Sequence, residues 1–189
     1  DLHPRVRRQR QMCIRDSDLT ANMNGLKNKV SKLKAAGATQ ADNGFNLAVK
    51  VMGSASARTD AKKVVIFFAD GSPTSSNGFE REVANNAVTA AKKLKDGGAT
   101  VYSIGIFDGA DPSSLGSNEN QFMHAVSSNF PKATSYKNRG DGDKDAGYYK
   151  AAKNASELNA IFDEIEKSET TTSAYTNVVM EDTLSDYVD

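Results

Sequence analysis

The sequence predicts an α/β domain built on a parallel β-sheet. Residues 64–69 and 101–107 are apolar runs rich in β-branched and aromatic side chains, as expected of strands buried between layers of helix. Segments with the 3.6-residue period of amphipathic helices lie before, between and after them. Strands separated by crossover helices form right-handed βαβ units, and therefore a parallel sheet.

Two helices are expected before the first strand. One face of the first helix gathers four apolar side chains: Met23, Leu26, Val30 and Leu33. Gly37 follows where a helix C-cap is wanted. Asp42 is expected to cap the second helix, which continues to Met52.

The rest of the chain continues the alternation of strand and helix. After residues 64–69 comes a turn, Asp70-Gly-Ser-Pro, and then Asn77 and Glu80 are spaced as in a capping box. That helix is expected to end at Gly97-Gly98. Beyond residues 101–107 the pattern predicts three further elements: a helix near 119–127, a short strand near 133–136, and a last helix capped by Ser156.

Composition excludes several classes of protein. The chain has 189 residues, with 24 basic and 24 acidic side chains, and this zero net charge argues against a nucleic-acid partner bound by phosphate neutralisation. A single Cys excludes an intramolecular disulfide framework and a multi-cysteine zinc site. The longest apolar run is too short to span a bilayer, so we expect no membrane insertion of this segment.

The first seventeen residues differ from the rest, with five Arg and no Lys. Such an arm could contact nucleic acid or act as a targeting signal, but it has neither an apolar signal core nor a helical face. Residues 7–17 resemble a translated sequencing adapter, and we predict that 1–17 is not native. The expected organisation is then a domain over 18–167, a linker over 168–176, and the start of an all-β, immunoglobulin-like domain over 177–189.

Two side chains suggest metal chemistry. In open parallel sheets, ligands bind outside the carboxyl ends of the strands, and Asp70 directly follows one such end. An ordinary turn would account for the same residue. Thr39 lies on a loop between the first two helices, and a hydroxyl together with a carboxylate offers the hard oxygen ligands that suit Mg²⁺. Two oxygens alone would not hold the ion.

Jointly, these pieces resemble the von Willebrand factor type A domain, in the version found in surface adhesins and pilus proteins of Gram-positive bacteria. The resemblance covers residues 19–167. It rests on six pieces: the loop Gly37-Ala38-Thr39 with the helix 43–52, the strand and turn 64–74, the strand 101–107, the helix and loop 122–131, Tyr148-Tyr149, and the helix 157–165.

The resemblance implies a doubly wound sheet of order 3-2-1-4-5-6 with a metal-ion-dependent adhesion site at its top. The ligands of that site are an Asp-x-Ser-x-Ser loop, a Thr and an Asp. Thr39 matches the Thr and Asp70 matches the Asp, and the implied ion is Mg²⁺ or Mn²⁺. The Asp-x-Ser-x-Ser loop has no counterpart in this sequence. We therefore expect an N-terminally truncated domain that keeps only the 4-5-6 half of the sheet, with residues 64–69 as an apolar edge prone to self-association.

The expected function is that of a binding module on a bacterial cell surface. It would adhere to a host or matrix protein through a carboxylate bridged by Mg²⁺. The alternative is a structural stalk or pilus module without a functional metal site. A metal-assisted enzyme is a third possibility, but nucleophile-elbow, P-loop and dinucleotide motifs are absent, so we expect no enzyme.

Other signals have simpler explanations. His124 lies on a predicted helix between apolar residues and is expected to be structural. The tripeptide Arg139-Gly140-Asp141 spells an integrin-binding motif, which also recurs by chance. The acidic run over 141–145 lacks the Gly and Glu of a calcium loop and is expected to be a solvated loop.

Overall fold

The computed structural model describes residues 19–33, 38–54, 57–76 and 78–171. The chain divides into two compact units, residues 1–153 and 154–189, which are described separately. The predicted non-native segment 1–17 and the predicted all-β segment 177–189 lie outside the described residues, as do Gly37 and Asn77.

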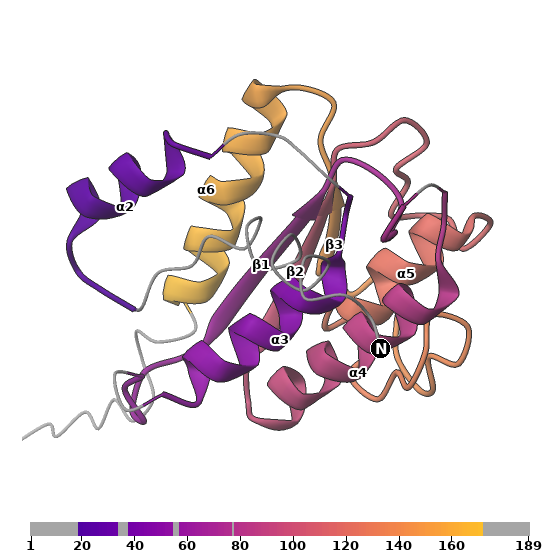
Figure 1. The fold of residues 1–189 in the computed structure, drawn as a ribbon, viewed down its shortest axis with the longest axis horizontal. Helices are drawn as coiled ribbons and strands as arrows, with labels where there is room; N and C mark the ends of the chain where they lie inside the picture. The colour runs from indigo at the N-terminus through magenta and orange to yellow at the C-terminus, as the bar shows by residue number, and fades with distance from the viewer. Residues whose placement is uncertain (1–18, 34–37, 55–56, 77, 172–189) are drawn as a thin grey trace, which may run out of the picture. The chain divides into compact units, whose positions relative to one another are not determined.

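A parallel sheet forms the centre of the first unit, which confirms the α/β prediction. Its strands are β1 (Val64–Ala69), β2 (Thr100–Gly105) and β3 (Tyr149–Ala151), in the order β1-β2-β3 (Figure 1). All six residues of β1 pair with β2, from Val64 opposite Thr100 to Ala69 opposite Gly105. The central strand β2 is buried from Val101 to Gly105, as its apolar run predicts.

Helices alternate with these strands. The first unit contains α2 (Met23–Val30), α3 (Ala41–Met52), α4 (Arg81–Asp96) and α5 (Asn118–Val126); the second contains α6 (Ala155–Thr171). In the second unit, α6 runs through Thr171, so residues 168–171 of the expected linker are helical. No helix in the described part of the chain combines the length and apolar character needed to cross a bilayer.

Three predicted helix starts were wrong. Gln40, not Asp42, is at the N-cap of α3, and α4 begins only after Glu80. In α6 the cap is Asn154, not Ser156: the Asn154 Oδ1 accepts a hydrogen bond from the Glu157 N–H at 2.9 Å, and its Nδ2 donates to the Glu157 carboxylate at 2.8 Å. An N-cap oxygen reaches an N–H two or three residues ahead, so a polar residue one or two positions later falls inside the first turn.

The strand predicted near residues 133–136 was also wrong. This segment is a tight loop in which the N–H groups of Thr134 and Ser135 both donate to the Asn138 carbonyl, at 2.9 and 3.1 Å. Backbone groups used in a local turn cannot join a ladder of strand hydrogen bonds. The third strand forms instead at Tyr149–Ala151 and begins with the second residue of the Tyr148-Tyr149 pair named in the sequence analysis.

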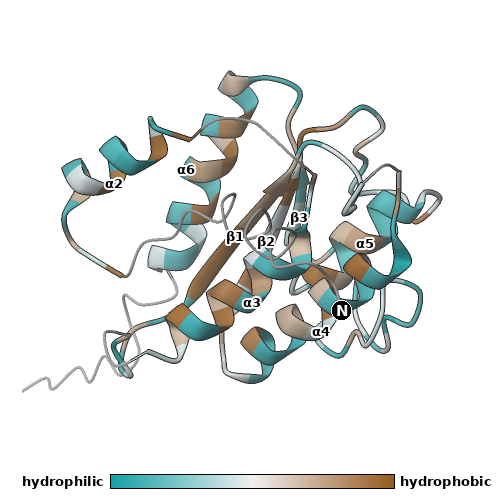
Figure 2. Cartoon of the chain, viewed as in Figure 1, coloured by the Kyte–Doolittle hydropathy of each residue, from teal (hydrophilic) through white to brown (hydrophobic). Residues whose placement is uncertain are grey.

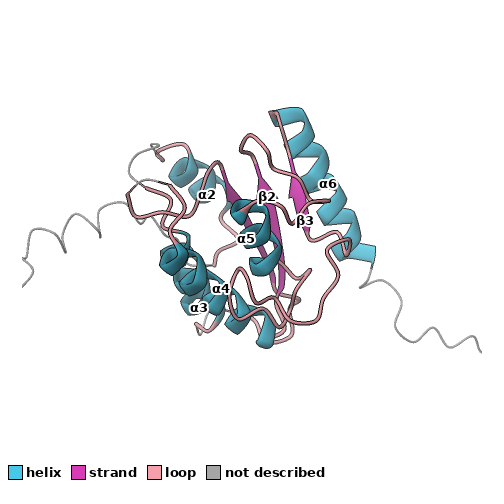
Figure 3. Ribbon diagram, turned by 90° about the vertical axis from the view of Figure 1, so that its right-hand side faces the viewer, coloured by secondary structure: helices cyan, strands magenta, loops and turns pink. Residues whose placement is uncertain are grey.

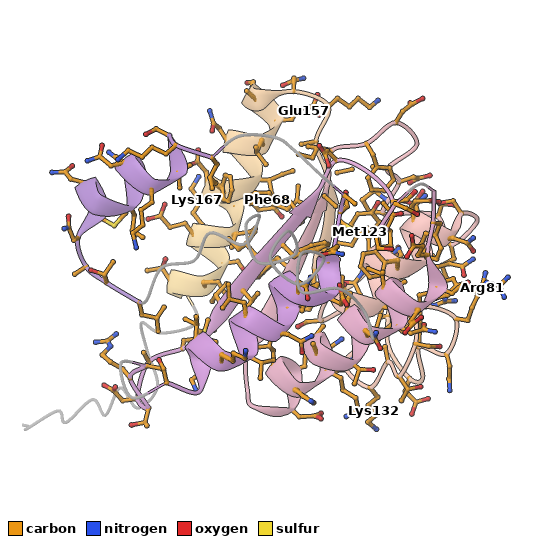
Figure 4. The ribbon with its side chains drawn as sticks, in the orientation of Figure 1. Phe68, Arg81, Met123, Lys132, Glu157 and Lys167 are labelled. Carbon is orange, nitrogen blue, oxygen red and sulfur yellow. The ribbon has the colours of Figure 1, made fainter. Side chains whose placement is uncertain are left out.

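One face of the sheet packs against α3, α4 and α5 (Figures 1 and 3). Phe67 of β1 anchors this layer: its ring centroid lies 4.8 Å from that of Phe45 on α3 and 6.1 Å from that of Phe122 on α5. Since side chains alternate along a strand, Phe68 projects from the opposite face (Figure 4).

The apolar run of β1, coloured brown in Figure 2, is less buried than its composition predicts. Most of β1 is half-buried, and Phe68 is 53% exposed. Within the described residues β1 has a strand partner on one side only, whereas β2 has one on both. Helix α2 carries three of the four predicted apolar side chains but ends at Val30, with Ser31 as its C-cap, so the prediction that it continues through Leu33 was wrong. The helix buries none of its residues, and Met23 and Val30 are both more than half exposed.

The long connection from α5 to β3 is held by one buried side chain, that of Asn129. Its Nδ2 donates to the Lys144 carbonyl at 2.7 Å and lies 2.9 Å from the Nδ1 of His124, and its Oδ1 accepts from the Tyr148 N–H at 2.8 Å. The Asn129 carbonyl also accepts from the Asp143 N–H. These bonds fix where the chain enters β3.

A half-buried ammonium holds the end of α5. The Nζ of Lys95, on α4, donates to the carbonyls of Ala125, Ser127 and Phe130 at 2.9–3.0 Å. Burial lowers the pKa of Lys95 to about 8. A cation at the C-terminal end of a helix also meets the negative end of the helix dipole.

Asn129→Ala should lower the free energy of unfolding by about 3 kcal/mol, because several buried polar groups lose their partners together. Urea unfolding followed by circular dichroism measures the change. The matched control is Asn86→Ala on the exposed face of α4, which should stay within about 0.5 kcal/mol of the parent chain. Equal changes in the two variants would contradict the assigned role of Asn129.

Candidate functional site

The candidate site lies where β1 and β2 end at the same level. The strands remain paired up to Ala69 and Gly105, and the Ala69 carbonyl accepts one more bond from the Ile106 N–H at 2.9 Å. Asp70 is the next residue after Ala69 and is exposed. It therefore occupies the position at which open parallel sheets bind ligands.

A backbone hydrogen bond joins the Thr39 loop to the turn after β1. The Thr39 carbonyl accepts from the Thr74 N–H at 2.9 Å, and Thr39 itself is half-buried. Two segments far apart in the sequence thus meet at the carboxyl end of β1. The structure brings the loops of both predicted metal ligands, Thr39 and Asp70, to the same edge of the sheet.

These two side chains also retain free oxygen atoms. Among the described residues, neither the Thr39 hydroxyl nor the Asp70 carboxylate has a hydrogen-bond or ion-pair partner. Their neighbour Ser72 differs, because its hydroxyl donates to the Glu119 carboxylate at the start of α5, at 2.7 Å. The unpartnered oxygens are the ones available to a ligand.

Glu80 organises the rest of the turn, a role that the sequence analysis missed. Its carboxylate accepts hydrogen bonds from the hydroxyls of Ser75, at 2.7 Å, and of Thr74 and Ser76, both at 3.1 Å. The Ser75 hydroxyl is the main cause that lowers the pKa of Glu80 to about 2. Three consecutive hydroxyl residues shortly before a Glu were the signal for this arrangement.

The described residues fit a divalent cation only in part. A Mg²⁺ ion takes about six oxygen ligands in octahedral geometry. Thr39 and Asp70 can supply two, and the described part of the chain contains no group of three or more His, Cys, Asp or Glu placed to hold a metal ion. Two oxygens do not complete an octahedral shell, so the described carboxylate and hydroxyl alone leave the site incomplete for Mg²⁺.

His124 is a core residue, as predicted. Its ring is fully buried and packs edge-on against Phe130 and Tyr149, with centroid distances of 5.9 and 4.9 Å. Burial lowers the pKa of His124 to about 4, so the side chain is neutral at physiological pH.

The Arg139-Gly140-Asp141 tripeptide is not presented as a free recognition motif. The Arg139 guanidinium donates to the Tyr136 carbonyl at 2.8 Å and lies over the Phe130 ring. The Asp141 side chain, in contrast, is 97% exposed. A partner that needs both side chains extended would have to release the arginine first.

Comparison with known proteins identifies the family. The model of the von Willebrand factor type A domain matches residues 15–143, more than half of the chain, so the protein belongs to this family. The parallel sheet with its crossover helix and the Asp at the carboxyl edge agree with that assignment. No curated protein and no solved structure matches the chain.

Membership gives the general kind of function. Domains of this family are generally protein-interaction or adhesion modules and often depend on a divalent metal ion. The matched region starts before Leu19 and stops at residue 143, ahead of β3, whereas the resemblance drawn from the sequence covered 19–167.

The buried His124 should make stability depend on pH. Between pH 6.5 and about 4 the unfolded chain binds a proton at this residue and the folded chain does not, so acid favours unfolding. We expect the free energy of unfolding to fall by up to about 3 kcal/mol across that window on account of His124. Urea titrations at several pH values measure this loss. His124→Gln cannot titrate, so its free energy of unfolding should fall by about 3 kcal/mol less than that of the parent between pH 6.5 and about 4. An equal fall in both chains would contradict the role assigned to His124.

Proposed function

We propose that this protein is a cation-dependent binding module, with Thr39 and Asp70 as two of the ligands of a divalent ion. The unpartnered oxygens of these side chains, on loops joined at the carboxyl end of β1, carry the proposal. When bound, Mg²⁺ or Mn²⁺ would offer a coordination position to a carboxylate of the partner. Thr39 and Asp70 position the ion directly or through water.

The proposed partner is a host or matrix protein, bound at the surface of a Gram-positive bacterium. Family membership supports a protein partner, and the likeness of the sequence to adhesin and pilus versions of the domain supports the location. The zero net charge of the chain disfavours nucleic acid. We propose binding and not catalysis, because the arrangement offers a carboxylate and a hydroxyl but no nucleophile paired with a base.

A structural stalk or pilus module is the second candidate. It is favoured by the ligand count, since Thr39 and Asp70 offer two oxygens and the described residues hold no group of three metal-binding side chains. In this case Thr39 and Asp70 are loop residues, and the domain contributes its fold alone. Cation binding distinguishes the two functions.

Binding of Mn²⁺ to the full chain, followed by the electron paramagnetic resonance signal of the free ion, tests the proposed function. We expect a dissociation constant on the order of 1 mM, typical of a site with few protein ligands. Asp70→Ala should weaken Mn²⁺ binding at least tenfold, because it removes the only charged ligand, and Thr39→Ala should weaken it less. Both variants should keep the circular dichroism spectrum of the parent, since neither side chain is fully buried.

The control is Asp60→Ala, which removes an exposed carboxylate from the loop that precedes β1, at the other end of the strand. It should bind Mn²⁺ as the parent does. If all three variants bind alike, the ion is not held at the carboxyl edge. No binding by the parent chain favours the structural module.

A further inference from the structure

A cavity lies at the amino end of β1, at the other end of the strand from the candidate cation site. It has a volume of about 670 Å³, within the range of small-molecule sites. Three segments of the first unit form it: residues 19–21 ahead of α2, the end of α3 at Met52, and the loop 57–63 that leads to Val64. The length of β1 therefore separates this cavity from Thr39 and Asp70.

Part of the lining of this pocket, here called the amino-end pocket, is apolar. Leu19, Met52 and Val64 line it together with small alanine side chains, and Leu19 is 44% exposed. None of the described lining residues is aromatic. Binding of an aliphatic ligand to this surface would be stabilised by roughly 25 cal/mol for each Å² of apolar area removed from water.

The charged residues of the lining are all cationic. Arg58, Lys62 and Lys63 line the pocket, and no acidic side chain is among its described lining residues. Arg58 is exposed and Lys63 half-buried, while Asp60, in the same loop, is exposed but does not line the pocket. A site with positive charge and no carboxylate excludes a metal cation and favours an anionic group, which the Arg fork can bind in bidentate fashion.

We propose that the amino-end pocket binds an anionic aliphatic amphiphile, such as a medium-chain fatty acid. Its carboxylate would lie between Arg58 and Lys63, and its chain along Leu19, Met52 and Val64. An aliphatic chain fits better than a nucleotide, because the lining offers no aromatic ring on which a base could stack. The site is independent of the proposed cation site.

Isothermal titration calorimetry of the full chain with sodium decanoate, below its micelle concentration, tests the proposal. We expect saturable binding at one site. Decyltrimethylammonium has the same chain and the opposite charge, and should bind at least tenfold more weakly. Arg58→Gln and Lys63→Gln should each weaken decanoate about tenfold, the usual effect of losing one charge-assisted hydrogen bond.

Two further variants separate charge from apolar contact. Lys93→Gln removes an exposed cation from α4, outside the pocket, and should leave decanoate binding unchanged. Leu19→Asn keeps the cations but removes apolar contact, and should weaken decanoate while the circular dichroism spectrum stays that of the parent. The proposal is overturned if decanoate fails to saturate, if both amphiphiles bind equally, or if Arg58→Gln and Lys63→Gln bind decanoate as the parent does.

Discussion

The pairing of β1 with β2 is the constraint on which the rest of the first unit depends. Six residues of each strand are in register, and β2 is the buried member of the pair. The last residue of β2 is a glycine because other parts of the chain approach closely there. A Cβ atom on Gly105 would lie 2.9 Å from the Ala110 Cβ and 3.1 Å from the Tyr149 hydroxyl. With the strand ends level, the turn after β1 meets the loop before α3, which places Asp70 and Thr39 at one edge.

The two ends of β1 differ in chemistry. At the carboxyl end, carboxylates accept most of the nearby hydroxyl hydrogens: Glu119 binds Ser72, and Glu80 binds the three residues that follow Pro73. Because these groups satisfy one another, Thr39 and Asp70 keep oxygens for an external ligand. At the amino end the pocket lining is cationic and apolar, which suits a ligand of opposite character. The two proposed sites therefore lie at opposite ends of β1. One favours a cation and the other an anion, so each disfavours the ligand of the other.

Sequence reasoning found the two candidate ligands but not the residues that hold the structure around them. Asp70 was visible because a carboxylate directly follows an apolar strand. Asn129 and Lys95 were not visible, since each acts through partners distant in sequence or through backbone carbonyls that no side-chain pattern records. Their importance follows from desolvation: a buried polar group must find all its hydrogen bonds, and only the packed chain shows where these are.

The sequence by itself determined the class of fold, the parallel order of the first two strands and most of the helices, because apolar periodicity reports which face of a segment is buried. The tertiary structure decided the helix starts at Gln40 and Asn154, the third strand at Tyr149–Ala151 and the partial exposure of β1. These depend on which donor reaches which acceptor and on what lies beside a strand. Both are properties of the assembled chain, and local composition does not encode them.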